Sequence, residues 1–276
     1  MDNTPASLYK YMPPERASSV LGELLIRFSQ VSVMNDIEEF KPPIEGLATK
    51  ECFEEKFGER AEVLYPGLME QIAKLGPDYM AKLRNQGEAS LPRTIEKIYG
   101  MNNRNFGILS LSEEPASECM WERYADQGRG FVVEFNPTHT WFRQMIAEDD
   151  DLRHLRRVVY VADRTPKTLL AITAQEYLYT KETKWEYERE WRIILNFNSA
   201  ACKAGKDNTG TDVLLFGIPP DCLVSVTVGY NASHEFQQQV QTMIATNPSL
   251  AHVRLKRAKQ LENGSLQIST MEPRNS

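Results

Sequence analysis

The chain has 276 residues, enough for one large domain or two small ones. Apolar residues make up 41% and charged residues 25%, which is usual for folded proteins and excludes collagen-like, disordered and coiled-coil classes. The formal net charge of −6 argues against a protein whose main activity is non-specific binding of nucleic acid.

The sequence carries no sign of export or of a membrane span. Met1-Asp2-Asn3-Thr4 has an acid where a signal peptide would be basic. The best apolar run, Val213 to Ile218, is only of strand size. The four cysteines occur singly, and the four histidines lie far apart without a zinc-protease motif. We therefore expect a cytoplasmic protein with no membrane partner and no metal site.

Strands and helices are predicted to alternate in the first half of the chain. Residues 7–12 and 26–29 alternate apolar and polar side chains as strands do, and a short helix is expected between them from Ser18. Residues 41–100 are less regular and are interpreted as a helical insertion. Within them, Leu64, Leu68, Ile72 and Leu75 predict one amphipathic helix that ends at Gly76-Pro77.

The second half repeats this mixture. Strands are expected at 106–111, 130–135 and 158–161, and the run 184–195 is expected to begin as loop and become strand. Helices are expected at 141–148, before the acidic triplet 149–151, and at 166–179. Two late strands enclose a helix capped by Ser233. The predicted fold is α+β: one domain over 1–270 with a central mixed or split sheet, flanking helices and the 41–100 insertion, followed by a frayed tail at 271–276.

The densest candidate site is the run Glu188-Arg189-Glu190-Trp191-Arg192. On a strand, period-two geometry puts Glu188, Glu190 and Arg192 on one face. Two acids beside one guanidinium could stabilise a cationic intermediate or bind ribose hydroxyls. The competing interpretation is an exposed ion pair on a solvated face.

Two further segments carry candidate binding residues. Arg27 and Ser29 share the polar face of their strand and could receive phosphate or ribose oxygens, whereas Asn35-Asp36 is typical of a turn or cap. Trp121 and Tyr124 are three residues apart on a predicted helix, so they form one aromatic patch, which is either core or a surface for stacking a ring.

Taken together, these segments resemble a prokaryotic family known as domain of unknown function 2971. The resemblance runs in order to about Tyr230. The usual Asn-Asp-Pro-Phe-Glu run of that family is replaced here by Asn35-Asp36-Ile37-Glu38-Glu39. The segments that carry the resemblance are 8–11, 25–29 with 35–36, 107–112, 120–126, 130–135 and 184–192.

The order of these segments also resembles that of ADP-ribosyltransferases. That resemblance implies an NAD substrate, with Lys10 on the first strand, Ser29 on the second and the Glu188-Arg189-Glu190 element on a late strand. Such enzymes have arginine or histidine where this chain has Lys10, between Tyr9 and Tyr11. The implied reaction breaks the nicotinamide–ribose bond through an oxocarbenium-like state.

The same resemblance assigns expected roles. Glu190 would hold the ribose 2′-hydroxyl, and Glu188 would orient or deprotonate the acceptor, which could be protein, nucleic acid or water. Lys10 and Arg27 would hold the pyrophosphate, and Ser29 would help to place the ribose. Trp121 or Tyr124 would stack on a ring. Tyr9 and Tyr11, which flank Lys10, and Arg192, in a small cationic pocket, are the other expected binding residues.

Two other classes of function stay open at the level of the sequence. A nuclease would use Asp36, Glu39, Glu188 and Glu190 as oxygen ligands of magnesium. A non-catalytic recognition module would bind a partner without either glutamate. The resemblance to toxin-like transferases suggests a bacterial toxin or antiviral defence effector.

Overall fold

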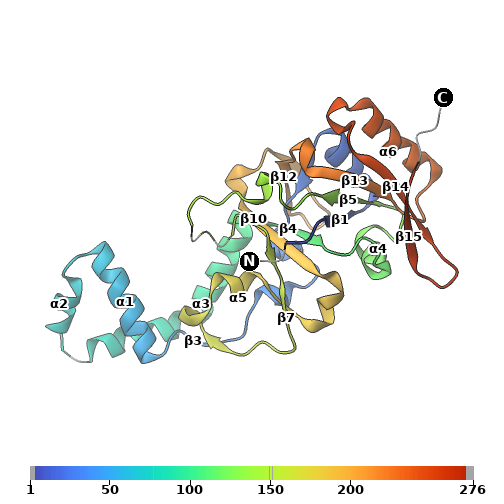
Figure 1. Cartoon of the computed structure of the whole chain (residues 1–276). Helices are drawn as coiled ribbons and strands as arrows, with labels where there is room; N and C mark the ends of the chain where they lie inside the picture. The colour runs from blue at the N-terminus through green and yellow to red at the C-terminus, as the bar shows by residue number, and fades with distance from the viewer. Residues whose placement is uncertain (1–3, 77, 149, 151, 272–276) are drawn as a thin grey trace.

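A mixed sheet of eight strands forms the centre of the computed structural model, which describes residues 4–76, 78–148, 150 and 152–271 (Figure 1). Its strand order is β15-β14-β13-β5-β1-β4-β10-β6. The bounds are β1 Leu8–Met12, β4 Phe106–Ser112, β5 Phe131–Phe135, β6 Arg156–Arg157, β10 Glu190–Asn196, β13 Leu223–Val228, β14 Arg254–Gln260 and β15 Leu266–Thr270.

The sheet is split between β1 and β4. β1 pairs with β5 along its whole length, from Leu8 opposite Phe135 to Met12 opposite Phe131. It meets β4 through one residue pair, Tyr9 with Ser112, and the two strands then diverge. β13 and β14 run parallel, whereas β4 and β10 run antiparallel. The α+β class with a mixed central sheet is therefore confirmed.

Both faces of the β4–β10 pair are covered. Leu109 and Ile193 point into the main core, which also holds the apolar side chains of β5 and β13. Ile108 and Ile194 point to the opposite face, into a second core cluster. Because side chains alternate along a strand, Ser110 and Glu190 lie on this second face as well. It is the face that carries the polar groups of the site.

Smaller sheets and short helices surround this centre. One smaller sheet has three antiparallel strands: β11 (Cys202–Lys206) pairs with β12 (Asp212–Gly217), and β12 pairs with β2 (Leu25–Arg27). β3 (Ile44–Gly46) pairs with β8 (Lys167–Thr168), and β7 (Val159–Val161) with β9 (Thr180–Glu182). The body also carries the α-helices α4 (Glu118–Tyr124), α5 (Ala174–Leu178) and α6 (His234–Thr246), and the short helix expected from Ser18 is a π-helix, Ser18–Gly22.

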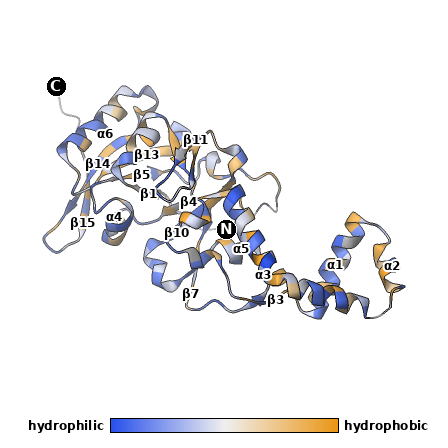
Figure 2. Ribbon diagram, turned by 180° about the vertical axis from the view of Figure 1, so that it is seen from behind, coloured by the Kyte–Doolittle hydropathy of each residue, from blue (hydrophilic) through white to orange (hydrophobic). Residues whose placement is uncertain are grey.

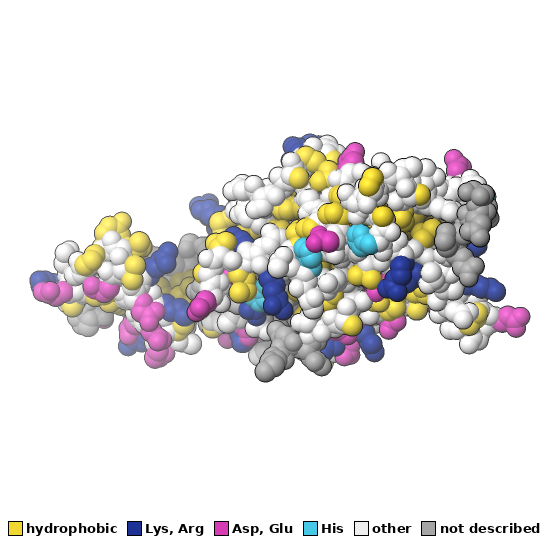
Figure 3. Space-filling view, turned by 45° about the horizontal axis from the view of Figure 1, so that its top comes forward, with side chains coloured by type: hydrophobic (Ala, Val, Ile, Leu, Met, Phe, Trp, Pro, Cys, Tyr) yellow, Lys and Arg dark blue, Asp and Glu magenta, His cyan; other side chains and the backbone are white. Residues whose placement is uncertain are grey.

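Helices α1 (Lys50–Leu64), α2 (Leu68–Ala73) and α3 (Tyr79–Asn105) form an arm that leads away from the sheet (Figure 1). The C-terminal end of α3 returns to the body, where it runs directly into β4. Hydropathy colouring shows apolar stretches in the outer arm as well as in the sheet (Figure 2). In the space-filling view the outer arm presents apolar, acidic and basic side chains together (Figure 3).

Local signals explain several elements. Ser233 begins α6, and its Oγ accepts a hydrogen bond from the backbone N–H of Phe236, as predicted. Gly130 lets the chain enter β5 tightly, because a Cβ there would lie 2.1 Å from the carbonyl oxygen of Met12. Within the described ranges, no helix is long and apolar enough to cross a membrane.

Three helix predictions are wrong. The expected helix at 166–179 is α-helical only over Ala174–Leu178 (α5), which begins there because Thr173 forms a capping box with Glu176; strand β8 and a 3-10 helix, Leu169–Ala171, precede it. The expected helix at 141–148 is a 3-10 turn at Thr140–Phe142. The single helix over Leu64–Leu75 is divided by Pro66 and by Gly67, which has a φ of 83°.

Some expectations concern residues that the structure does not describe. They are Pro77 at the end of the predicted helix, two members of the acidic triplet (149 and 151), and 272–276 of the expected tail.

Candidate functional site

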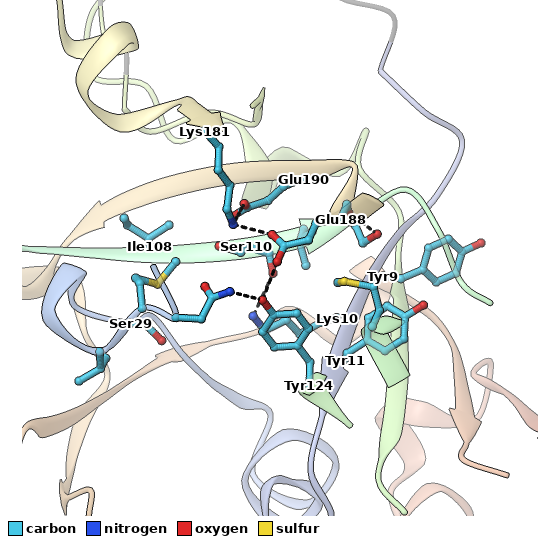
Figure 4. A pocket seen from close by; sticks show the side chains of 16 residues that line it. Tyr9, Lys10, Tyr11, Ser29, Ile108, Ser110, Tyr124, Lys181, Glu188 and Glu190 are labelled. Carbon is cyan, nitrogen blue, oxygen red and sulfur yellow. Dashed lines mark hydrogen bonds and ion pairs between the residues drawn. The ribbon is translucent and has the colours of Figure 1, made fainter. Parts of the chain in front are cut away.

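A cavity of about 280 Å³ opens where β1 and β4 diverge (Figure 4). Its walls come from β1, from β4, from the start of β10, from α4 and from the segment 29–35. Parts of the chain about 180 residues apart, from Tyr9 to Glu190, therefore meet at one place. The predicted site residues in this lining are Tyr9, Lys10, Tyr11, Ser29, Tyr124, Glu188 and Glu190.

A backbone kink brings Glu188 and Glu190 to the same cavity. Glu188 ends a 3-10 helix, Thr183–Glu188, and Glu190 begins β10. Arg189 between them has left-handed backbone geometry with a φ of 42°, and its side chain is 58% exposed. The two glutamates line the cavity together although only one of them belongs to the strand.

Lys181, from β9, bridges the two carboxylates (Figure 4). Its Nζ lies 2.5 Å from Glu188 Oε2 and 3.1 Å from Glu190 Oε2. Burial favours the neutral amine, but the charges of Glu190 and Glu39 outweigh it and raise the pKa of Lys181 above its ordinary value. Lys181 is therefore a fixed cation between two carboxylates.

Arg192 and Glu39 complete a buried charge cluster beneath the cavity. Arg192 donates through Nε to Glu190 Oε1 at 2.7 Å and through Nη2 to Glu190 Oε2 at 2.8 Å, and it also pairs with Glu39. Burial acts to raise the pKa of Glu190, yet Arg192 and Lys181 hold that pKa well below its usual range. Glu190 is therefore ionised at neutral pH.

The exposed ion pair considered from the sequence is wrong for this segment. Glu188 is 4% exposed, Glu190 3% and Arg192 0%. With Glu39 and Lys181 they make a buried cluster, defined here as Glu39, Lys181, Glu188, Glu190 and Arg192. If all five are ionised, three negative and two positive charges leave it a formal charge of −1.

Tyr124 presents its phenol to Glu188 from α4. Its hydroxyl donates to Glu188 Oε1 at 2.6 Å and accepts from Asn35 Nδ2 at 2.6 Å. Burial, followed by the charge of Glu188, raises the pKa of Tyr124, so the phenol stays neutral. Asn35 thus contacts the site. Asp36 is the N-cap residue of the 3-10 helix Ile37–Phe40, and its backbone carbonyl accepts from the N–H of Glu39 at 3.3 Å, in agreement with the turn-or-cap interpretation. Its carboxylate does not cap this helix but accepts from Trp185 Nε1 at 2.7 Å.

Lys10 supplies a second cation to the cavity. It is partly buried on β1, and its Nζ donates to the backbone carbonyl of Ser110 at 2.9 Å. Burial lowers the pKa of Lys10 to about 8, although Glu190 and Glu188 act in the opposite direction. Lys10 is therefore mostly charged at pH 7 and titrates just above it.

The remaining predicted site residues lie outside the cavity lining. Arg27 pairs with Asp207 at 2.6 Å. Trp121 is fully buried, packs edge-on against Tyr11 with 5.5 Å between ring centroids, and donates its indole N–H to Pro115. Arg192 belongs to the buried cluster and pairs with Glu190, which lines the cavity.

Lys181 was missed from the sequence. It lies in an unremarkable polar run, Thr180 to Lys184, directly after a stretch predicted as helix. The available signal was charge balance, since two glutamates beside one arginine leave a carboxylate that needs another cation if the face is buried.

The carboxylates considered for a nuclease are already engaged. Glu39, Glu188 and Glu190 each contact Lys181 or Arg192, and Asp36 contacts Trp185. Across the described part of the chain, no group of three or more histidine, cysteine, aspartate or glutamate side chains is arranged to hold a metal ion.

Residues 120–193 match the family model described as "Protein of unknown function (DUF2971)". The resemblance to this family is confirmed. The matched segment contains one of the three tyrosines of the cavity and most of the charged groups of the site, namely Tyr124, Lys181, Glu188, Glu190 and Arg192, whereas β1 and Ser29 lie before it. The search of curated proteins gave no match, and neither did the search of solved structures.

Proposed function

We propose that the chain cleaves the nicotinamide–ribose bond of NAD and transfers ADP-ribose to a protein, a nucleic acid or water. The observation that supports this most directly is the convergence of Lys10, Ser29 and the Glu188/Glu190 pair around one cavity. These are the positions that the resemblance to ADP-ribosyltransferases assigns to NAD. They come from three distant strands or strand ends, so the convergence is a property of the fold.

The electrostatics of the cavity suit this reaction. Cleavage of the bond develops positive charge on the ribose, as in glycoside hydrolysis. Glu190 is ionised and held in place by Arg192 and Lys181, which fix its carboxylate at the edge of the cavity. A fixed carboxylate that need not reorganise stabilises such a transition state more than the ground state.

The dimensions limit which part of NAD enters. A volume of about 280 Å³ is at the lower end of the roughly 300–1,000 Å³ typical of ligand pockets. The nicotinamide riboside end would occupy it, with the ring near Tyr124 and the ribose near Ser29 and Glu190. Lys10 would meet the pyrophosphate, and the adenosine would lie outside the cavity. In a bacterium, this activity would suit a toxin or antiviral defence effector.

The test is release of nicotinamide from NAD by the purified chain, with and without protein or nucleic-acid acceptors. Glu190→Gln and Glu188→Gln are expected to lower the rate at least about 100-fold, as loss of a preorganised electrostatic group does. Glu186→Gln is the matched control, because Glu186 is exposed on the same 3-10 helix and should turn over NAD at the original rate.

Thermal unfolding of each variant separates loss of chemistry from loss of fold. If the folded wild-type chain leaves NAD intact with every acceptor class, or if both buried-glutamate variants keep full activity, the proposal is wrong. Binding of a partner that survives both substitutions would then favour a recognition module.

A further inference from the structure

A second and larger cavity, of about 640 Å³, lies against the same face of β4 and β10. Ile108 and Ile194 form part of its floor, and Ile108 also borders the smaller cavity. Its other walls are the C-terminal half of α3 and the chain around β3 and β8. Phe40 lies between this cavity and the buried cluster: it lines the cavity, and its ring centroid is 5.4 Å from Cζ of the Arg192 guanidinium.

The walls of this second cavity are strongly apolar. Along α3, Ile95, Ile98 and Tyr99 follow helical spacing and face it, and Leu169 and Leu170 close the opposite side. Protein interiors are normally packed to crystal density, so an apolar volume of this size is more than packing irregularity leaves. It falls within the roughly 300–1,000 Å³ range of small-molecule sites.

The rim of this second cavity carries a charged side chain, that of Lys41, and within the described residues it is the only one of the lining. Its Nζ lies 5.9 Å from the centroid of the Tyr99 ring, directly beside the apolar wall of α3. Its partner Glu38, at 2.9 Å, is 76% exposed and Lys41 is 47% exposed, so this ion pair is weak and a second carboxylate can share the ammonium.

We infer that this cavity binds a monoanionic amphiphile of the fatty-acid type, with its apolar chain against α3 and its carboxylate at Lys41. The apolar walls select the chain, and the single cation at the rim selects the sign of the head group. A concave site of this size takes a small molecule, whereas a protein helix would need an open groove. The site is separate from the one proposed for NAD.

The experiment is calorimetric titration of the full chain with submicellar laurate, dodecanol and dodecyltrimethylammonium. Laurate is expected to bind one to one and most tightly, followed by dodecanol and then the cation. Decanoate should bind roughly tenfold more weakly than laurate, because two fewer methylene groups are buried. Absence of saturable laurate binding, or binding of the cation at least as tight, overturns the inference.

Two variants locate the bound molecule. Thr94→Trp fills the cavity from α3 and should abolish laurate binding, whereas Glu96→Trp, exposed on the same helix, should leave it unchanged. Lys41→Met should keep dodecanol binding and remove the preference for laurate. Laurate binding that persists in a folded Thr94→Trp chain, or a preference that persists in Lys41→Met, overturns the site.

Discussion

At the scale of single residues, Lys181 decides whether the buried carboxylates can coexist. Its Nζ contacts Glu188 and Glu190 and lies 3.6 Å from Glu39 Oε2. Without it, Arg192 would be the one cation left in the buried cluster for three carboxylates. Removing one partner of a buried ion pair leaves an uncompensated charge, which costs about 3–5 kcal/mol. We expect Lys181→Met to lower the free energy of unfolding by that amount at pH 7.

The pH dependence of this loss has a definite sign. The folded-state pKa of Glu190 is depressed, so its ionised form stabilises the wild type above the unfolded-state pKa of about 4.3, and this is lost as the pH falls. The pKa of Lys181 is raised, so its contribution is present below about 10.4 and lost above. The difference between wild type and Lys181→Met should therefore be largest between about pH 5 and 10.

Urea unfolding across this range measures the difference. Lys184→Met is the control, because Lys184 is 58% exposed and its removal should change stability by less than about 0.5 kcal/mol. Equal destabilisation of the two variants, or an effect at Lys181 that does not depend on pH, would contradict the role of the buried cluster.

Lys10 gives a second prediction, which concerns substrate affinity. If its ammonium binds the NAD pyrophosphate, the KM for NAD should rise about tenfold between pH 7 and pH 9, because a group with a pKa of about 8 loses most of its charge there. Lys10→Arg stays charged throughout and should have a flat KM profile. Steady-state kinetics of both proteins check this, and parallel profiles would remove Lys10 from the binding site.

At the scale of elements, the left-handed backbone turn at Arg189 directs the side chains of Glu188 and Glu190 into the same cavity. A non-glycine residue in the left-handed region costs roughly 1–2 kcal/mol, and a β-branched one suits it least. Arg189→Gly should therefore keep or slightly raise stability, and Arg189→Val should lower it by about 1–2 kcal/mol in urea unfolding. Arg254→Val, at an exposed position of β14, should change it by less than about 0.5 kcal/mol. Equal effects of the two valine variants would contradict the turn.

The sequence predicts elements well where one local signal dominates. Period-two alternation located β1, the apolar run at 130–135 located β5, and Ser233 located the start of α6. The sequence-based prediction failed where a segment distant in the chain determines the local structure. Residues 167–168 are a strand because they pair with β3, and Lys181 lies on β9, which pairs with β7. The shared face of Glu190 and Arg192 followed from periodicity, whereas their burial depends on elements far away in the chain.

At the scale of the whole molecule, the arm and the body are joined at a narrow base. The backbone N–H of Leu47 lies 2.9 Å from a carboxylate oxygen of Glu88, and the Leu47 side chain packs directly over Gly87. The chain therefore leaves and re-enters the body at nearly one point. Both cavities are lined by residues outside 49–86.

Replacing residues 49–86 with a four-residue glycine-serine linker should thus preserve the body, because the linker spans a short distance and closing a short loop costs little. The replacement removes the stacked Phe53–Phe57 pair and the hydrogen bond from Lys56 to the Leu170 carbonyl, both of which involve the arm. We expect cooperative thermal unfolding and unchanged laurate binding. Adding Thr94→Trp to this shortened chain fills the cavity from α3 and should abolish that binding. Loss of cooperative unfolding in the first variant would show that the arm is part of the folding core.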